Sequence, residues 1–311
     1  MAMKSLRYGS LKLFVDHYGL SVPVRWPEVF GRKAPLEVEI GFGTGEYLFR
    51  LARSHPNHDF VGIEENVERI HKTLRRLETA KVANVRLMHV DARLAFERYF
   101  SARTIKHVHC LFPCPWPRKN QVKHRLFSNG FLKLVNNRLT SGAMIELVTD
   151  HEEYAQWVRS EIARTGFKLD VGQISPRFDT KFERKWCEAG QEEFFALTFT
   201  KSKHLARPPA KEKDLKVYFF DDFDPASFRF EDHKGKTSVI FKEFIFDQKR
   251  SYGMVHLLVA EDYLQQHLWA KVLKTAHKGW CLAVADGSLV IPTDGVAKAL
   301  ELLYRCLCRR S

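Results

Sequence analysis

Three acidic residues each close a short apolar run in the first hundred residues: Glu39, Glu64 and Asp91. Carboxylates can accept hydrogen bonds from ribose hydroxyls or from an adenine amino group, and they can balance a cation. A turn with Gly41, Gly43 and Gly45 follows the first acid, and glycines let a ligand approach the main chain closely. Together, the acids and the turn predict a binding site for S-adenosylmethionine, whose sulfonium is positively charged.

Two other interpretations of this region stay open. The dinucleotide fingerprint of an oxidoreductase needs a third glycine at position 46, where this chain has Glu46, and a carboxylate there would repel a pyrophosphate. Alternatively, the glycines form only a structural turn, and the acids at the strand ends cap helices. Helix capping is a plausible role for any one of these acids, but it is less plausible for all three together.

A proline-rich loop follows a fourth apolar run and reads F-P-C-P-W-P-R-K from Phe112 to Lys119. Its prolines restrict the backbone. Trp116 offers a face on which an extruded base can stack, and Arg118 and Lys119 can bind phosphates beside it. The structural alternative is that Trp116 fills a core.

These residues need a scaffold that brings them to one edge. Apolar runs predict strands over 36–41, 59–64, 85–90, 107–112, 143–148 and 193–200, and helical spacing predicts helices over 45–54, 67–80, 127–139 and 152–165. Such alternation predicts an α/β fold with a doubly wound, mainly parallel sheet. Ligands of these sheets bind beyond the carboxyl ends of the strands.

The chain is expected to form two domains. Residues 1–203 form the α/β domain, the proline-containing stretch 204–214 is a linker, and 215–311 form a small α+β domain. In the second domain we expect strands over 217–220, 238–246 and 254–260, a helix over 262–276, a hairpin at Asp286-Gly287 within 280–291, and a final helix over 294–310. The apolar stripe of that helix could contact a second copy or the other domain.

The charge favours an anionic partner. The net charge is +13, and residues 1–203 contribute +10 of it. No Asp or Glu occurs from Arg98 to Ile145, a stretch that contains nine cations: Arg98, Arg103, Lys106, Arg118, Lys119, Lys123, Arg125, Lys133 and Arg138. We interpret this stretch as a polyanion-binding face whose affinity depends on salt.

Composition excludes several classes. With 45% apolar and 28% charged residues the chain is a folded protein, and no apolar run is long enough to span a membrane. The first residues have no apolar stretch typical of a secretory signal. The six cysteines lack zinc-site spacing, so no metal is expected. We expect a cytoplasmic protein.

The ordered motifs resemble those of the bacterial-type tRNA (guanine-N7)-methyltransferases. The resemblance covers about residues 30–201 and rests on these segments: E-I-G-F-G-T-G at Glu39–Gly45, G-I-E at Gly62–Glu64, D-A at Asp91-Ala92, F-P-x-P-W-P-x-K at Phe112–Lys119, T-D at Thr149-Asp150 and T-K-F-E-R at Thr180–Arg184. It implies a class I methyltransferase (Rossmann-like) fold, S-adenosylmethionine contacts at Glu39, Glu64 and Asp91, and tRNA contacts at Arg118, Asp150, Thr180, Lys181, Phe182 and Glu183.

One position departs from the family. The family loop has Asp, its usual candidate catalytic residue, where this chain has Cys114. A thiol is a poor acceptor, so we expect reduced or altered activity, with Asp150 able to take over recognition of the base. A nucleophilic role for Cys114 stays an alternative, as does a catalytically inactive homologue that binds RNA. The protein is expected to be a monomer or a homodimer.

Overall fold

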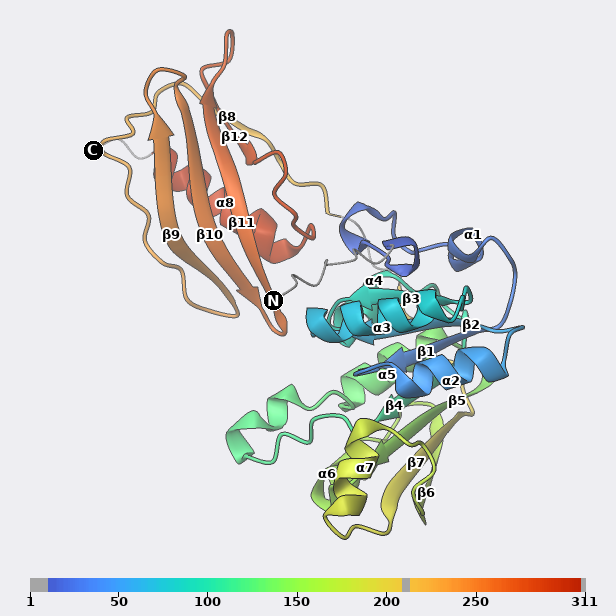
Figure 1. Ribbon diagram of the computed structural model, residues 1–311. Coiled ribbons are helices and arrows are strands. Elements are labelled where there is room, and N and C mark those ends of the chain that lie inside the picture. Colours follow the sequence, from blue (N-terminus) through green and yellow to red (C-terminus); the bar gives the residue numbers. More distant parts are fainter. Residues whose placement is uncertain (1–10, 209–212, 309–311) are drawn as a thin grey trace, which may run out of the picture. The chain divides into compact units, whose positions relative to one another are not determined.

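The computed structural model describes residues 11–208 and 213–308 (Figure 1). The chain divides into two compact units, Met1–Ala210 and Lys211–Ser311. This division falls inside the expected linker 204–214, of which residues 209–212 lie outside the described residues. The units are described separately as unit 1 and unit 2.

Unit 1 contains a seven-stranded sheet with the order β3-β2-β1-β4-β5-β7-β6. The first five strands in this order are parallel, and β7 runs antiparallel to both neighbours. The strands are β1 (Leu36–Ile40), β2 (Asp59–Glu64), β3 (Val85–His89), β4 (Ile105–Leu111), β5 (Leu139–Thr149), β6 (Phe167–Ile174) and β7 (Phe194–Lys201). The prediction of a mainly parallel α/β fold is confirmed.

Helices cover both faces of this sheet (Figure 1), so every residue of β1 and β2 is buried. They are α1 (Trp26–Phe30), α2 (Glu46–Ser54), α3 (Val67–Thr79), α4 (Ala92–Arg98), α5 (Asn129–Arg138), α6 (Glu152–Ser160) and α7 (Lys181–Glu188), with short 3₁₀ turns η1 (Leu11–Leu13), η2 (His17–Gly19) and η3 (Lys119–His124). The sequence patterns missed α1, α4, α7 and β6. Each missed helix is shorter than nine residues, too short to show much periodicity.

A charged array lies buried in the middle of this sheet. His109 on β4 lies between two carboxylates, with Nε2 2.9 Å from Glu37 Oε2 on β1 and Nδ1 3.4 Å from Glu146 Oε2 on β5. Burial alone would raise the pKa of Glu37, but hydrogen bonds from His109 and His58 lower it to about 2. Burial alone would lower the pKa of His109, but Glu146 and Glu37 raise it to about 9. The imidazolium is therefore charged at neutral pH and joins three adjacent strands.

The same array positions α2 on the sheet. The Tyr47 hydroxyl, in the first turn of α2, lies 3.5 Å from both His109 Nδ1 and Glu146 Oε2. The Tyr47 ring packs edge-on against the His109 ring, with 5.6 Å between centroids. Arg177, far along the chain, donates from Nη2 to Glu146 Oε1 at 2.9 Å. The N-terminus of α2, where the glycine turn ends, is thus fixed by the array.

Unit 2 is a five-stranded antiparallel sheet, order β8-β12-β11-β10-β9, with one helix packed on it. Its elements are β8 (Tyr218–Phe220), β9 (Thr237–Asp247), β10 (Tyr252–Glu261), β11 (Leu264–Lys274), β12 (Trp280–Val284) and α8 (Asp294–Leu307). The expected α+β class is confirmed. The apolar stripe of α8 is buried in the core of unit 2, so this stripe is not a surface for another copy or domain.

Two expectations for unit 2 are wrong. The stretch expected to be a helix, 262–276, contains strand β11 instead, because Gln266, Leu268, Ala270 and Val272 are buried at a period of two, which is that of a strand. The hairpin turn lies at Asp262-Tyr263, between β10 and β11, whereas no strand follows Asp286-Gly287 up to residue 308, where the described part of the chain ends. Among the described residues, no helix combines the length and apolar character needed to cross a membrane.

Replacing the buried imidazolium tests the array. H109Q should lower the free energy of unfolding by about 3 kcal/mol near pH 5.5, because it removes the cation between buried Glu37 and half-buried Glu146 and leaves them only His58 and Arg177 at their outer sides. The raised pKa of His109 makes its contribution complete below about pH 6.5 and lost as pH rises through about 9. The lowered pKa of Glu37 makes its contribution complete above about pH 4.5 and lost as pH falls towards 2.

Thermal and urea unfolding of the full chain should therefore show the largest difference between wild type and H109Q from pH 4.5 to 6.5, shrinking by pH 9. His71 is exposed on α3 and provides the control variant H71Q. Equal stability of H109Q and H71Q at pH 5.5 would refute the role given to the array.

Candidate functional site

The carboxyl ends of the five parallel strands bring the predicted residues to one edge of the sheet. The strand order places them in a row, with Asp91 after β3, Glu64 on β2, Glu39 on β1, Cys114 in the loop after β4 and Asp150 after β5. Because β1 and β4 are neighbours but far apart in sequence, a crevice for ligands is expected between their carboxyl ends. The three acids lie on the β1 side of this crevice, and the proline-rich loop lies on its β4 side.

The glycine turn adopts a conformation that needs glycine. Gly41, Gly43 and Gly45 have φ values of 69°, 55° and 69°, in the left-handed region. A Cβ on Gly45 would also lie 2.3 Å from the Thr73 side chain. Glu64 supports the turn, because its Oε2 accepts a hydrogen bond from Gly43 N at 2.9 Å while its Oε1 accepts from the next two backbone N–H groups. Glu64 thus ties the turn to β2.

Glu39 is the unusual acid of the three. Its side chain is buried, and its Oε2 has no hydrogen-bond partner among the described residues. Burial raises the pKa of Glu39 to about 8, and the neighbouring charge of Glu64 contributes, although His109 and Arg50 oppose the shift. A buried acceptor without a partner costs free energy unless something binds to it. This site therefore suits a cationic or hydrogen-bonding group of a ligand.

Asp91 has an evident structural role. It is the N-cap of α4, and its Oδ1 accepts hydrogen bonds from Arg93 N at 2.7 Å and Leu94 N at 3.4 Å. Its Oδ2 lies 3.4 Å from Arg93 Nη2. The helix-cap alternative is thus confirmed for Asp91, whereas Glu39 caps no helix.

The proline-rich loop is held in place by an arginine that the sequence analysis counted only as surface charge. Arg125 is buried, donates from Nε to Pro115 O at 2.9 Å and lies over the Trp157 ring at 5.2 Å. Cys114, in this loop, is exposed. Trp116 is half-buried, has a φ of 45° and lies against His124, with 5.2 Å between the ring centroids. Part of its side chain is therefore accessible to solvent.

Around this loop the predicted polar residues are accessible. Arg118 and Lys119 are exposed and form no ion pair within residues 11–208. Asp150 is half-buried after β5, and its main-chain oxygen accepts a hydrogen bond from Gln191 at 3.3 Å. β5 lies next to β4, so Asp150 and Cys114 follow adjacent strands of the sheet.

The T-K-F-E-R segment forms a turn that starts α7. Thr180 is the N-cap and accepts a hydrogen bond from Glu183 N at 3.2 Å. Glu183 is buried and accepts hydrogen bonds from the N–H groups of Arg177 and Phe178 at 2.8 and 3.0 Å. Thr180 and Glu183 thus build the turn, whereas Lys181 and Phe182 are exposed and available to a ligand.

Helix α2 connects this segment to the glycine turn. Glu46, the first residue of α2, accepts hydrogen bonds from Lys181 N and from Arg184 Nη2, both at 2.8 Å. Burial would raise the pKa of Glu46, but these two bonds lower it. One turn later, Arg50 donates to Phe178 O. In the sequence, Glu46 serves only to exclude a dinucleotide-binding turn, because no pattern signals its contact with Lys181, 135 residues away.

The prediction that 98–145 forms one basic face is wrong. Arg98, Arg125 and Arg138 are buried, and Arg138 donates to the main-chain oxygens of Phe96 and Glu97. Arg103 precedes β4 and therefore lies at the opposite edge of the sheet. The cations that are exposed around the proline-rich loop are Arg118, Lys119 and Lys123.

One group of side chains has the composition of a metal site: Glu37, His107 and His109. The two imidazole rings stack at 3.9 Å between centroids, so their lone pairs do not converge on one point. Both ring nitrogens of His109 already contact carboxylates. We therefore interpret this group as part of the structural array.

Comparison with known proteins gives consistent results. A family model described as putative methyltransferase matches residues 33–196. Proteins described as tRNA (guanine-N(7)-)-methyltransferase are 41% identical over 181 residues in Chlorobium phaeobacteroides (58% of this chain, 89% of the relative) and 39% identical over 178 residues in Thermotoga maritima (56% and 57%). A Thermus thermophilus protein of the same description is 32% identical over 294 residues (90% and 92%), so its similarity extends into unit 2.

The turn before α7 and the T-K-F-E-R motif together form the 177–184 segment. Its link to α2 can be tested directly. E46Q should speed amide hydrogen exchange at Lys181 about tenfold, because the carboxylate that accepts this N–H and pairs with Arg184 is neutralised. Glu68 is exposed in the first turn of α3, so E68Q is a matched control. If exchange at Lys181 is the same in both variants, Glu46 does not hold the segment.

Proposed function

The chain belongs to the family of tRNA (guanine-N7)-methyltransferases, and from that premise we propose that it transfers a methyl group from S-adenosylmethionine to N7 of a guanine in tRNA. The observation that carries the proposal is the single row of strand ends. It puts the glycine turn and its acids beside the proline-rich loop and the accessible cations.

The acid side of the row fits S-adenosylmethionine, which when bound supplies a methyl group on a cationic sulfur. Glu39 offers a buried, unpartnered carboxylate oxygen to a positive charge. Gly41, Gly43 and Gly45 keep side chains away from the turn, so that the adenosine and methionine parts can lie against the main chain. Glu64 and Asp91 complete the cofactor-binding set, with Glu64 also shaping the turn.

The loop side of the row fits the nucleic acid. Trp116 would stack on the target guanine, while Arg118 and Lys119 would contact flanking phosphates. Lys181 and Phe182, two of the exposed residues of the 177–184 segment, would extend this surface. Thr180 and Glu183 would act by holding the segment, because their polar atoms are used within it.

The reaction asks for alignment more than for proton transfer. Guanine N7 has an in-plane lone pair and no proton, so its bond to the methyl carbon forms as the carbon–sulfur bond breaks, and no base is needed. A carboxylate at position 114 would orient the guanine edge and balance the cation that forms, and Cys114 does neither well. Asp150, which follows the neighbouring strand, would supply this acceptor.

A second candidate function follows from Cys114, which stands where the family has Asp. In this case the protein would bind tRNA but would methylate it slowly or not at all. Methylation measurements beside binding titrations separate the two functions, because only the first predicts a methylated product.

Three further expectations belong to this proposal. Unit 1 would be sufficient for the chemistry, because it contains every residue of the candidate site. A tRNA substrate implies a cytoplasmic protein. The oligomeric state would be a monomer or a homodimer, which sedimentation of the full chain would determine.

Restoring the family carboxylate tests the role of position 114. C114D should raise the initial rate of methyl transfer to unmodified tRNA about tenfold, because a charged acceptor would then face the guanine edge. C114A should keep the wild-type rate, since the thiol contributes little. Transfer of radiolabelled methyl groups measures all three proteins.

The outcomes separate the alternatives. Loss of activity in C114A alone would favour a nucleophilic cysteine. No activity in either wild type or C114D would refute the proposed function.

The buried carboxylate predicts a pH dependence. Because the pKa of Glu39 is raised to about 8, the carboxyl is largely neutral at pH 6.5 and largely ionised at pH 8.5. The affinity for S-adenosylmethionine should therefore rise about tenfold over this range, as the carboxylate forms beside the ligand cation. Calorimetry should find weaker binding and a flatter pH response in E39Q. The same pH response in E39Q and wild type would show that Glu39 is not the group involved.

A further inference from the structure

A hollow of about 210 Å³ lies at the edge of the unit 1 sheet opposite the candidate site. Arg103 precedes β4, Ser141 lies near the start of β5, and Lys201 ends β7, which runs antiparallel and so finishes at this edge. The full lining is Arg103, Ser141, Lys201, Ser202, Lys203 and His204. It contains three cations and a histidine, and no carboxylate.

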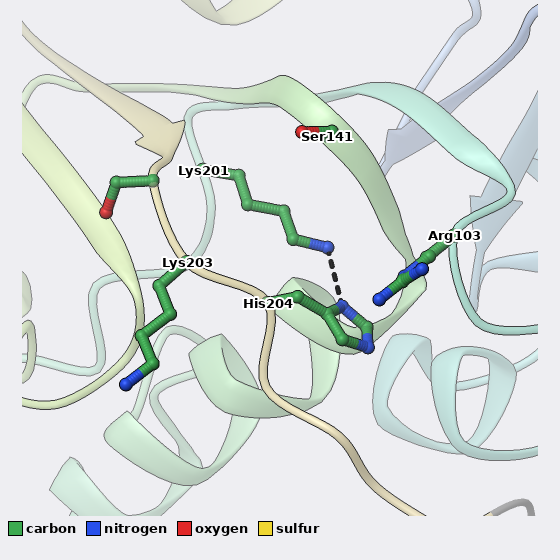
Figure 2. A pocket seen from close by; sticks show the side chains of 6 residues that line it. Arg103, Ser141, Lys201, Lys203 and His204 are labelled. Carbon is green, nitrogen blue, oxygen red and sulfur yellow. Dashed lines mark hydrogen bonds between the residues drawn. The ribbon is translucent and has the colours of Figure 1, made fainter.

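Two of the three cations of this pocket point toward its histidine (Figure 2). The Arg103 guanidinium and the Lys201 ammonium both point toward the His204 ring, whereas the Lys203 ammonium points away. Burial and the nearby Arg103 lower the pKa of Lys201 to about 8. Burial and the charges of Lys201 and Arg103 likewise lower the pKa of His204. A bound anion would relieve this repulsion.

Lys201 contributes charge rather than a free donor. Its side chain is buried, and its ammonium donates to Asn136 O at 2.7 Å, to Leu139 O at 2.5 Å and to His204 Nδ1 at 3.0 Å. These bonds use all three of its N–H groups. Because His204 Nδ1 accepts, the neutral ring carries its hydrogen on Nε2.

The free donors are therefore supplied by other residues. Within residues 11–208, Arg103 is exposed and its guanidinium has no ion pair or hydrogen bond. The Ser141 hydroxyl and His204 Nε2–H are the other donors available to a ligand in the pocket. A planar guanidinium, with a hydroxyl and an imidazole N–H in the lining of the same pocket, can donate to the oxygens of a phosphate group.

We propose that this pocket binds a phosphodiester group of the tRNA backbone, an inference that rests on the proposed function. It is a second contact, away from the base that reacts. β4 has seven residues, so the pocket lies about 20 Å from the opposite edge of the sheet. At about 3.4 Å per nucleotide along a stacked strand, this is about six nucleotides from the target guanine.

Removing the guanidinium tests the pocket. R103Q should weaken binding of unmodified tRNA about fivefold and reduce the slope of log Kd against log salt concentration by about 0.7 to 0.9, as expected for one lost phosphate contact. Lys81 is the matched control, because it is exposed and has a φ of 54°, close to the 58° of Arg103. K81Q removes the same charge before β3, at the same edge of the sheet but three strands away from β4.

Two further measurements keep this inference distinct from the function. Calorimetry with S-adenosylhomocysteine should give equal affinities for wild type, R103Q and K81Q. If wild type methylates tRNA and R103Q has the salt slope of K81Q, the pocket is not a phosphate site although the function stands. If wild type neither binds nor methylates tRNA, the proposed function and this inference both fail.

Discussion

The buried imidazolium of His109 is the interaction on which the site of unit 1 depends. Two carboxylates, Glu37 and Glu146, would repel each other inside the sheet, and the cation between them offsets this repulsion. β1, β4 and β5 meet at this point, and the edge where they end carries the glycine turn, the proline-rich loop and Asp150. Tyr47 of α2 contacts the array through its hydroxyl. The geometry of the reacting edge thus depends on charges that lie two or three residues before the strand ends.

Helix α2 transmits this geometry in two directions. Its N-terminus ends the turn that would hold the methyl donor, and its first two turns hold the 177–184 segment through Glu46 and Arg50. A rearrangement of the turn would therefore move the surface proposed to contact tRNA. This coupling explains why a carboxylate follows the glycines at position 46, where a dinucleotide-binding protein would need glycine.

Much of unit 1 could be predicted from sequence, because buried parallel strands appear as short apolar runs. The carboxyl ends of these strands lie at one edge of the sheet, independent of the length and sequence of the loops. The roles of individual side chains could not. Arg125 and Arg138 were counted with the surface charge, yet they are buried against main-chain oxygens supplied by other elements. Glu183 looked like a ligand contact and holds a turn. β11 was mistaken for a helix, since its alternating pattern includes the polar Gln266, buried through hydrogen bonds to Ile291.

We propose that this row of strand ends aligns a methyl donor with guanine N7 despite Cys114. Nucleoside mass spectrometry of tRNA incubated with the full chain and S-adenosylmethionine tests it most directly. We expect 7-methylguanosine as the one new modified nucleoside. Methylation of a different base or atom, or tRNA that stays unmodified, would contradict it.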